Sequence, residues 1–167
     1  MPTITALVPA FNEAGSIGAT IEALLAQSRI PDRIVVIPNG CTDDTASIAR
    51  SYPVNVLELP KLKHKKSEAL NRAWNQYGKD ADIVVCLDAD TVLPPNAVAD
   101  WEQEFMNDTP PGTKGELAKP LGGSSSKFTM LGGDFLTRLQ RAEFAKWTDT
   151  ALRRRRTSVL AGTGCAI

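Results

Sequence analysis

Two aspartates, separated by one small residue, follow a strongly apolar segment near the middle of the chain. The segment, residues 83–87, is a continuous run of mostly β-branched residues, and Asp88-Ala89-Asp90 comes directly after it. Such a run is typical of a strand buried on both faces of a sheet. Side chains alternate along an extended chain, so we expect the two carboxylates to project to the same side.

Two carboxylates this close repel each other unless a cation lies between them or one of them is protonated. Open α/β sheets bind ligands at the carboxyl ends of their strands. The pattern therefore indicates a divalent-metal site formed by Asp88 and Asp90. The simpler alternative is that both are solvated turn residues that precede a helix beginning near Pro95.

Elements that could position this pair precede it in a repeated order of strand, polar loop and helix. Strands are expected at residues 4–8, 33–37 and 54–59, with Pro9 and Pro60 ending the first and the third. Helices are expected from Ser16, from Thr42 and over residues 67–74, and another over residues 95–105. This alternation predicts an α/β fold with a parallel sheet and right-handed crossovers.

The last third of the sequence is less regular. Proline, glycine and serine are frequent in residues 107–126, which indicates a loop-rich stretch. A strand is expected at 128–131, a helix from Asp134, and a last strand at 157–160 before a glycine-rich segment. At 167 residues we expect a single domain over 1–167, with its core in residues 1–106 and a variable segment in residues 107–167.

Composition excludes several classes of protein. Nineteen basic and nineteen acidic residues cancel, so no overall field would attract nucleic acid, and none is expected as a partner. Cys41, Cys86 and Cys165 are odd in number and far apart, which argues against a disulfide framework or a zinc cluster. No apolar run approaches the roughly twenty residues of a membrane span, and the first residues do not resemble a signal peptide. We therefore expect a cytoplasmic protein.

Four motifs in this order resemble those of the family two glycosyltransferases. Pro9-Ala10-Phe11-Asn12-Glu13 is similar to the family's Pro-x-x-Asn-Glu loop, and residues 33–45 are similar to its strand followed by Asp-Asp-Gly-Ser-Thr-Asp. Lys66-Ser67-Glu68-Ala69-Leu70-Asn71 is similar to its Lys-x-x-Ala-Leu-Asn segment, and Asp88-Ala89-Asp90 to its metal-binding Asp-x-Asp. The resemblance implies a GT-A (Rossmann-like) fold, which is α/β, with a mostly parallel central sheet and helices on both faces.

The resemblance also implies a donor-binding site for a nucleotide sugar. Its candidate residues are Pro9, Ala10, Phe11, Glu13, Asn39, Lys66, Asp88, Ala89 and Asp90. Phe11 could cover the base and Glu13 could accept from ribose hydroxyls. The alternatives are that Phe11 is a core residue and that Glu13 only favours the start of a helix.

Asn39 departs from the family pattern, because an aspartate that accepts from uracil N3–H usually stands at this position. An amide offers both a carbonyl acceptor and an N–H donor, so Asn39 could still pair with uracil, and a UDP-sugar is favoured. The alternative is a turn residue selected for positive φ.

Charged residues complete the implied site. Lys66 is expected near the donor diphosphate, whereas the neighbouring basic residues are read as a solvated surface. Asp90 is expected to be the strongest direct ligand of Mn²⁺ or Mg²⁺, and Asp88 to contact the ribose, the metal or a metal-bound water, since hard divalent ions prefer oxygen ligands.

The reaction implied is metal-dependent, inverting transfer from a nucleoside-diphosphate sugar to an unknown acceptor, a lipid or a glycan. The general base and the Gln-x-x-Arg-Trp segment of longer members are not found, so the catalytic residue is unknown and donor binding is better supported than transfer. Donor hydrolysis by water is one variant of this reading. The alternatives are a nucleotide-sugar-binding module that needs a partner chain for its base, and a structural domain that keeps only the fold.

Four consecutive arginines, Arg153, Arg154, Arg155 and Arg156, suggest a separate hypothesis. They could make peripheral contact with an anionic membrane surface or bind a phosphorylated acceptor. The alternative is a solvated helix end that complements the helix dipole.

Overall fold

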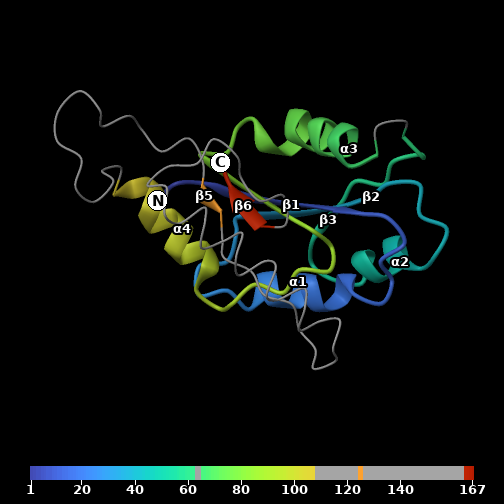
Figure 1. Ribbon diagram of the computed structural model, residues 1–167, viewed down its shortest axis with the longest axis horizontal. Coiled ribbons are helices and arrows are strands. Elements are labelled where there is room, and N and C mark those ends of the chain that lie inside the picture. The colour runs from blue at the N-terminus through green and yellow to red at the C-terminus, as the bar shows by residue number, and fades with distance from the viewer. Residues whose placement is uncertain (63–64, 108–123, 126–163) are drawn as a thin grey trace, which may run out of the picture.

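The computed structural model describes residues 1–62, 65–107, 124–125 and 164–167. Strands and helices alternate along most of this part of the chain (Figure 1). The elements are β1 (Ile4–Ala10), α1 (Ile17–Leu25), β2 (Arg33–Pro38), α2 (Thr45–Arg50), β3 (Asn55–Val56), α3 (Lys65–Ala73), the π-helical turn η1 (Trp74–Gly78), β4 (Ile83–Leu87), α4 (Ala97–Met106), β5 (Ser124–Ser125) and β6 (Gly164–Ala166).

The strands form one sheet in the order β3-β2-β1-β4-β6-β5. β1 is parallel to β2 and β4, and β2 is parallel to β3, whereas β6 is antiparallel to β4 and to β5. The strand order reverses at β1, because β2 and β3 lie on one side of it and β4 on the other. The loops that follow β1 and β4 lead away from each other at such a point, and open α/β sheets bind ligands there.

Helices cover both faces of the sheet, with α3 on one side and α1 and α2 on the other (Figure 1). On the side of α1, α2 and α4, buried residues of these helices pack against alternate residues of β1, β2 and β4. On the side of α3, Ala69 and Ala73 pack with Leu7, Val35 and Val84. Both faces of the parallel strands are therefore buried, which explains their continuous apolar sequences. The predicted α/β architecture is confirmed.

Several predicted boundaries are wrong in detail. β1 continues through Pro9 to Ala10 beside β2, although its pairing with β4 ends at Leu7. A residue without an N–H is tolerated here because one flank of the strand no longer has a partner. β3 covers only two of the six predicted residues, but the Leu57 and Leu59 amides still donate to β2 carbonyls. α2 begins at Thr45 instead of Thr42. The elements predicted at 128–131, from Asp134 and at 157–160 lie outside the described residues.

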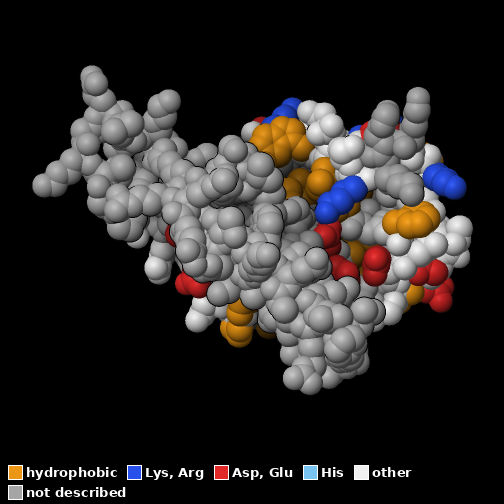
Figure 2. Space-filling view, in the orientation of Figure 1, with side chains coloured by type: hydrophobic (Ala, Val, Ile, Leu, Met, Phe, Trp, Pro, Cys, Tyr) orange, Lys and Arg blue, Asp and Glu red, His pale blue; other side chains and the backbone are white. Residues whose placement is uncertain are grey.

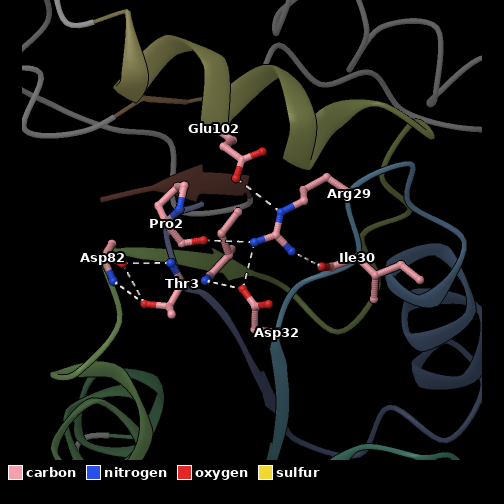
Figure 3. A network of polar contacts seen from close by, with 8 residues as sticks. Pro2, Thr3, Arg29, Ile30, Asp32, Asp82 and Glu102 are labelled. Carbon is pink, nitrogen blue, oxygen red and sulfur yellow. Dashed lines mark hydrogen bonds and ion pairs between the residues drawn. The ribbon is translucent and has the colours of Figure 1, made fainter.

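A polar network joins the amino ends of the strands (Figure 3), whereas the Asp88–Asp90 segment follows the carboxyl end of β4. The Arg29 guanidinium contacts Glu102 of α4 at 3.2 Å and Asp32 at 2.8 Å, and it also donates to the Pro2 carbonyl. The side chains of Arg29 and Glu102 are only 16% and 14% exposed, so this pair is shielded from solvent. The network connects α4 to the start of β1 and of β2.

Aspartates in this region have lowered pKa values. Hydrogen bonding from Arg29, followed by the Ile4 N–H, holds the pKa of Asp32 below its ordinary value of 3.8. The backbone N–H and the hydroxyl of Thr3 lower the pKa of Asp82 in the same way. The charged form of each carboxyl is therefore favoured more in the folded chain than in the unfolded one.

Gly40, after β2, is packed too tightly for any side chain. Its φ is +65°, and an added Cβ would lie 2.6 Å from Lys61 Cα. The Gly40 N–H donates to the Leu59 carbonyl at 2.9 Å, which fixes it against the chain that leaves β3. Only glycine satisfies both the left-handed backbone and this close approach.

Two further observations concern residues within the described part of the chain. No helix there is both long and apolar enough to span a membrane. Cys41 and Cys86 form no disulfide within this part of the chain.

The lowered pKa values of Asp32 and Asp82 predict an acid-sensitive fold. The unfolded chain takes up protons near the ordinary aspartate pKa, whereas the folded chain resists protonation to lower pH. The free energy of unfolding should therefore fall as the pH drops below about 4. In Asp32→Asn this fall should be shallower, which urea unfolding at pH 5, 4 and 3 would measure. The exposed Asp80, replaced by Asn, serves as the matched control, and an equal change in slope for both variants would contradict the prediction.

Gly40→Ala should lower the free energy of unfolding by about 2 kcal/mol or more, since a residue with a side chain is strained at this φ and would also collide with Lys61. Gly15→Ala is the control, because nothing lies within 4 Å of an added Cβ at that position. Its effect should stay within about 0.5 kcal/mol. Chemical unfolding measures both, and equal stabilities of the two variants would exclude the packing argument.

Candidate functional site

A pocket of about 340 Å³ lies where β1 and β2 end. Five of the predicted donor-binding residues line it together with two others. The lining residues are Pro9, Ala10, Phe11, Asn39, Lys61, Leu62 and Lys66. Basic, acidic and hydrophobic side chains of the described residues lie side by side on this face of the molecule (Figure 2).

Phe11 is 49% exposed and forms part of the pocket wall, so it is not a core residue. Its ring has the size and apolar character to cover a flat base. Pro9 and Ala10 are the last two residues of β1, so the carboxyl end of this strand forms one side of the pocket.

Asn39 is only 6% exposed and holds the chain that follows β3. Its Oδ1 accepts from the Leu62 N–H at 3.1 Å, and its own N–H donates to the Ala10 carbonyl at 3.0 Å. The positive φ values among the described residues are at Asn12 and Gly40, so the alternative that Asn39 was selected for positive φ is wrong. Asn39 instead places Leu62, and with it Lys61, on the pocket wall.

Sequence reasoning did not assign Asn12 or Asp43, which connect the loops around the pocket. Asn12 Oδ1 accepts from the Thr42 N–H at 2.8 Å. Asp43 accepts from the Ala14 N–H at 3.0 Å and from the Thr45 hydroxyl at 2.5 Å, and the latter bond lowers the Asp43 pKa. The loop after β1 is therefore tied to the loop after β2 through side chains. The signal in the sequence for this role was Asn12 itself, because asparagine tolerates the left-handed backbone conformation of such loops.

Lys61 and Leu62 also line the pocket, although they are not among the candidate donor-binding residues. Lys61 was read with the solvated basic run, and it is exposed while also lining the pocket. The signal in the sequence was Pro60, because residues directly after a parallel strand lie on the same edge of the sheet as those after its neighbours.

Asp88 lies beside the pocket and forms an ion pair with Lys66, which spans from α3 to the residue after β4. The Asp88 side chain is 27% exposed. The Thr91 N–H donates to the Asp88 carbonyl at 3.1 Å, so residues 88–91 form a turn. Ala89 is buried within the core and Asp90 is exposed. Because β4 ends at Leu87 and residues 88–91 form a turn, the projection of both carboxylates to the same side stays a prediction.

Glu13 does not line the pocket described above. Its Oε2 accepts from the Ser16 hydroxyl at 2.6 Å, and its carbonyl accepts from the N–H groups of Ser16 and Ile17 at the start of α1. Glu13 therefore contributes to the helix start, and its contact with a ribose stays a prediction.

The carboxylates fit a hard divalent cation. Asp88 and Asp90 supply oxygen atoms that water can reach, and no cluster of three or more His, Cys, Asp or Glu side chains suited to a metal occurs in the described ranges. Two carboxylates leave several positions of an octahedral ion to other oxygens, as is usual when Mg²⁺ or Mn²⁺ is bound jointly with phosphates.

Two predicted features lie outside the described residues. One is the cluster Arg153, Arg154, Arg155 and Arg156, and the other is most of the variable segment at 107–167. Both stay predictions.

Solved structures share this fold. The mannosyltransferase PcManGT from Pyrobaculum calidifontis, in complex with GDP-Man and Mn²⁺, superposes with a TM-score of 0.68 at 22% identity, covering 99% of this chain and 44% of that one. The glucosyl-3-phosphoglycerate synthase of M. tuberculosis has a TM-score of 0.50 at 29% identity, covering 60% of this chain and 38% of that one.

Curated relatives match over a shorter share of their length. The hyaluronan synthase of Streptococcus pyogenes is 25% identical over 122 residues, which are 68% of this chain and 29% of the relative. The succinoglycan biosynthesis protein ExoA of Rhizobium meliloti is 35% identical over 92 residues, 53% of this chain and 28% of the relative. The chain thus spans less than a third of the length of either protein.

The model of the family described as glycosyl transferase family 2 matches residues 5–147, which include all four motifs and the whole pocket. On this match and the fold, the chain belongs to glycosyl transferase family 2.

Proposed function

We propose that this chain binds a nucleoside-diphosphate sugar, with UDP as the favoured nucleotide, and supplies the donor half of an inverting, metal-dependent glycosyltransferase. The observation that carries the proposal is the pocket at the end of β1 and β2, with Phe11 on its wall and Lys66 between it and Asp88. The apolar wall matches the base of such a donor, the ammonium of Lys66 matches the diphosphate, and the Asp88 carboxylate matches the metal that the diphosphate oxygens would share.

The residues of the site divide these tasks. Phe11, Pro9 and Ala10 would bind the base, for which they offer apolar surface and backbone polar groups. Asn39 holds the opposite wall through Leu62, and its amide is the group that would distinguish one base from another. The Lys66 ammonium would hold the diphosphate by charge.

Asp88 and Asp90 would hold Mn²⁺ or Mg²⁺. A bound divalent cation acts as a Lewis acid for the diphosphate leaving group in this class of reaction. The Lys66 ammonium is positively charged, as the metal ion is, so it would also stabilise the negative charge that develops on the leaving phosphate. The general base is not assigned, and water in place of an acceptor would give donor hydrolysis.

The acceptor is proposed to be a glycan. This follows from the name of the hyaluronan synthase and from that of the poly-β-1,6-N-acetyl-D-glucosamine synthase of Staphylococcus aureus, which is 30% identical over 109 residues. Both names denote synthesis of a polysaccharide.

The first test is a set of UDP- and GDP-sugars, each with and without Mn²⁺, measured by thermal shift and by release of free nucleoside diphosphate. Ligands that bind the native state raise the melting temperature by linkage. A UDP-sugar should raise it most, and only with Mn²⁺. In Asp90→Ala the Mn²⁺-dependent shift and the release should be lost while the fold is kept.

Asp80→Ala is the control for this test, because Asp80 is exposed at the opposite end of β4. Full Mn²⁺-stimulated release in Asp90→Ala would overturn the assignment of the metal site. A shift without release in the unchanged chain would favour the binding module over the transferase.

Lys66→Met should affect donor and metal in opposite directions. The Lys66 ammonium pairs with the Asp88 carboxylate, which would also hold the metal, so Mn²⁺ alone should bind the variant at least as tightly as the unchanged chain. Donor affinity in the presence of Mn²⁺ should fall about tenfold, since a charge-assisted hydrogen bond is worth about 1.5 to 3 kcal/mol.

Isothermal titration with MnCl₂, and then with UDP in the presence of Mn²⁺, measures both effects. Lys79→Met, which removes an exposed lysine after η1, is the control for loss of charge. Weaker binding of Mn²⁺ alone to Lys66→Met would show that Lys66 supports the metal instead of competing with it.

A further inference from the structure

Thr20 of α1 makes a buried contact with the turn that carries the two aspartates. Its side chain is 0% exposed, and its Oγ1 donates to the Ala89 carbonyl at 2.8 Å. Ala89 stands between Asp88 and Asp90 and lies 69 positions after Thr20 in the sequence. The hydroxyl therefore reaches the peptide unit that joins Ala89 to Asp90.

The alternative partner of this hydroxyl is the Ser16 carbonyl, one helical turn earlier, at 3.5 Å. A hydroxyl has a single proton, and the shorter contact identifies Ala89 as its acceptor. Because Ala89 is 4% exposed, loss of the hydroxyl would leave a shielded carbonyl without this donor.

The residues that follow α1 hold the chain beyond the turn. The Gln27 side chain, 4% exposed, donates through Nε2 to the Pro94 carbonyl at 2.8 Å and accepts through Oε1 from the Val98 N–H at 3.1 Å. The Ser28 N–H donates to the Pro95 carbonyl at 2.8 Å. Thr20 in α1 and Gln27 just after it thus hold the two ends of the segment 89–98, which includes Asp90.

We propose that Thr20 is a positioning residue for the metal-binding turn, acting through the Ala89 carbonyl and without touching metal or donor. The metal part of this inference rests on the function proposed above. Loss of a hydrogen bond that orients a metal ligand from outside the coordination sphere commonly lowers metal affinity by about tenfold or more. The hydroxyl would act here by holding the peptide unit that joins Ala89 to Asp90, and with it the position of Asp90 relative to Asp88.

Three variants of the full chain test this proposal. Thr20→Val removes the hydroxyl at nearly constant volume, and Thr20→Ser keeps it. Thr5→Val is the matched control, because Thr5 is 3% exposed and its hydroxyl lies 3.4 Å from the Tyr77 carbonyl, near the amino end of the sheet.

The first readout needs no ligand. Hydrogen exchange of the Thr91 amide, which donates to the Asp88 carbonyl, reports whether the turn is held. Relative to the amides between β1 and β2, Thr91 should exchange about tenfold faster in Thr20→Val, and as in the unchanged chain in Thr20→Ser and Thr5→Val. Unchanged relative exchange in Thr20→Val, or an equal rise in Thr5→Val, would overturn the proposal.

The second readout is the dissociation constant of Mn²⁺ alone, which should rise about tenfold in Thr20→Val and stay within about twofold in Thr20→Ser and Thr5→Val. Unchanged Mn²⁺ affinity in Thr20→Val would overturn the proposed effect on the metal. If the unchanged chain bound no Mn²⁺ while Thr91 still responded to Thr20→Val, the proposed function would fail and the positioning role of Thr20 would stand.

Discussion

Parallel pairing of β1 with both β2 and β4 is the constraint on which the site depends. The three strands run in the same direction, so the chains that leave them emerge at one edge of the sheet. The apolar sequences that bury these strands on both faces therefore also decide where the polar loops gather. Residues 9–16, 39–45 and 88–91 come together for this reason, although up to about eighty positions separate them.

Side-chain hydrogen bonds to backbone groups then hold the loops at this edge. Asn12 holds the Thr42 amide, Asp43 holds the Ala14 amide, Asn39 holds the Leu62 amide and Thr20 holds the Ala89 carbonyl. Each joins two segments that are distant in sequence. Polar cross-links of this kind are directional, so they specify loop geometry more narrowly than apolar contacts, which tolerate sliding.

The fold could be predicted from the sequence, because buried parallel strands and amphipathic helices have distinct periodicities. The gathering of Pro9, Phe11, Asn39 and Lys66 in one pocket also followed, since each lies at or just after the carboxyl end of a strand or at the start of the next helix. The role of Asn39 toward Leu62 and that of Thr20 toward Ala89 did not follow, because each depends on a partner far along the chain. Proline led to an error at β1, since its effect depends on whether a neighbouring strand needs the missing amide.

The network around Arg29, Asp32 and Glu102 lies at the amino ends of the strands (Figure 3), whereas the pocket lies where β1 and β2 end. Changes at well-separated sites usually combine additively. Substitutions in the pocket and substitutions in this network should therefore have independent effects on the protein. The residues that line the pocket can vary without disturbing the ion pairs that hold the other end of the sheet.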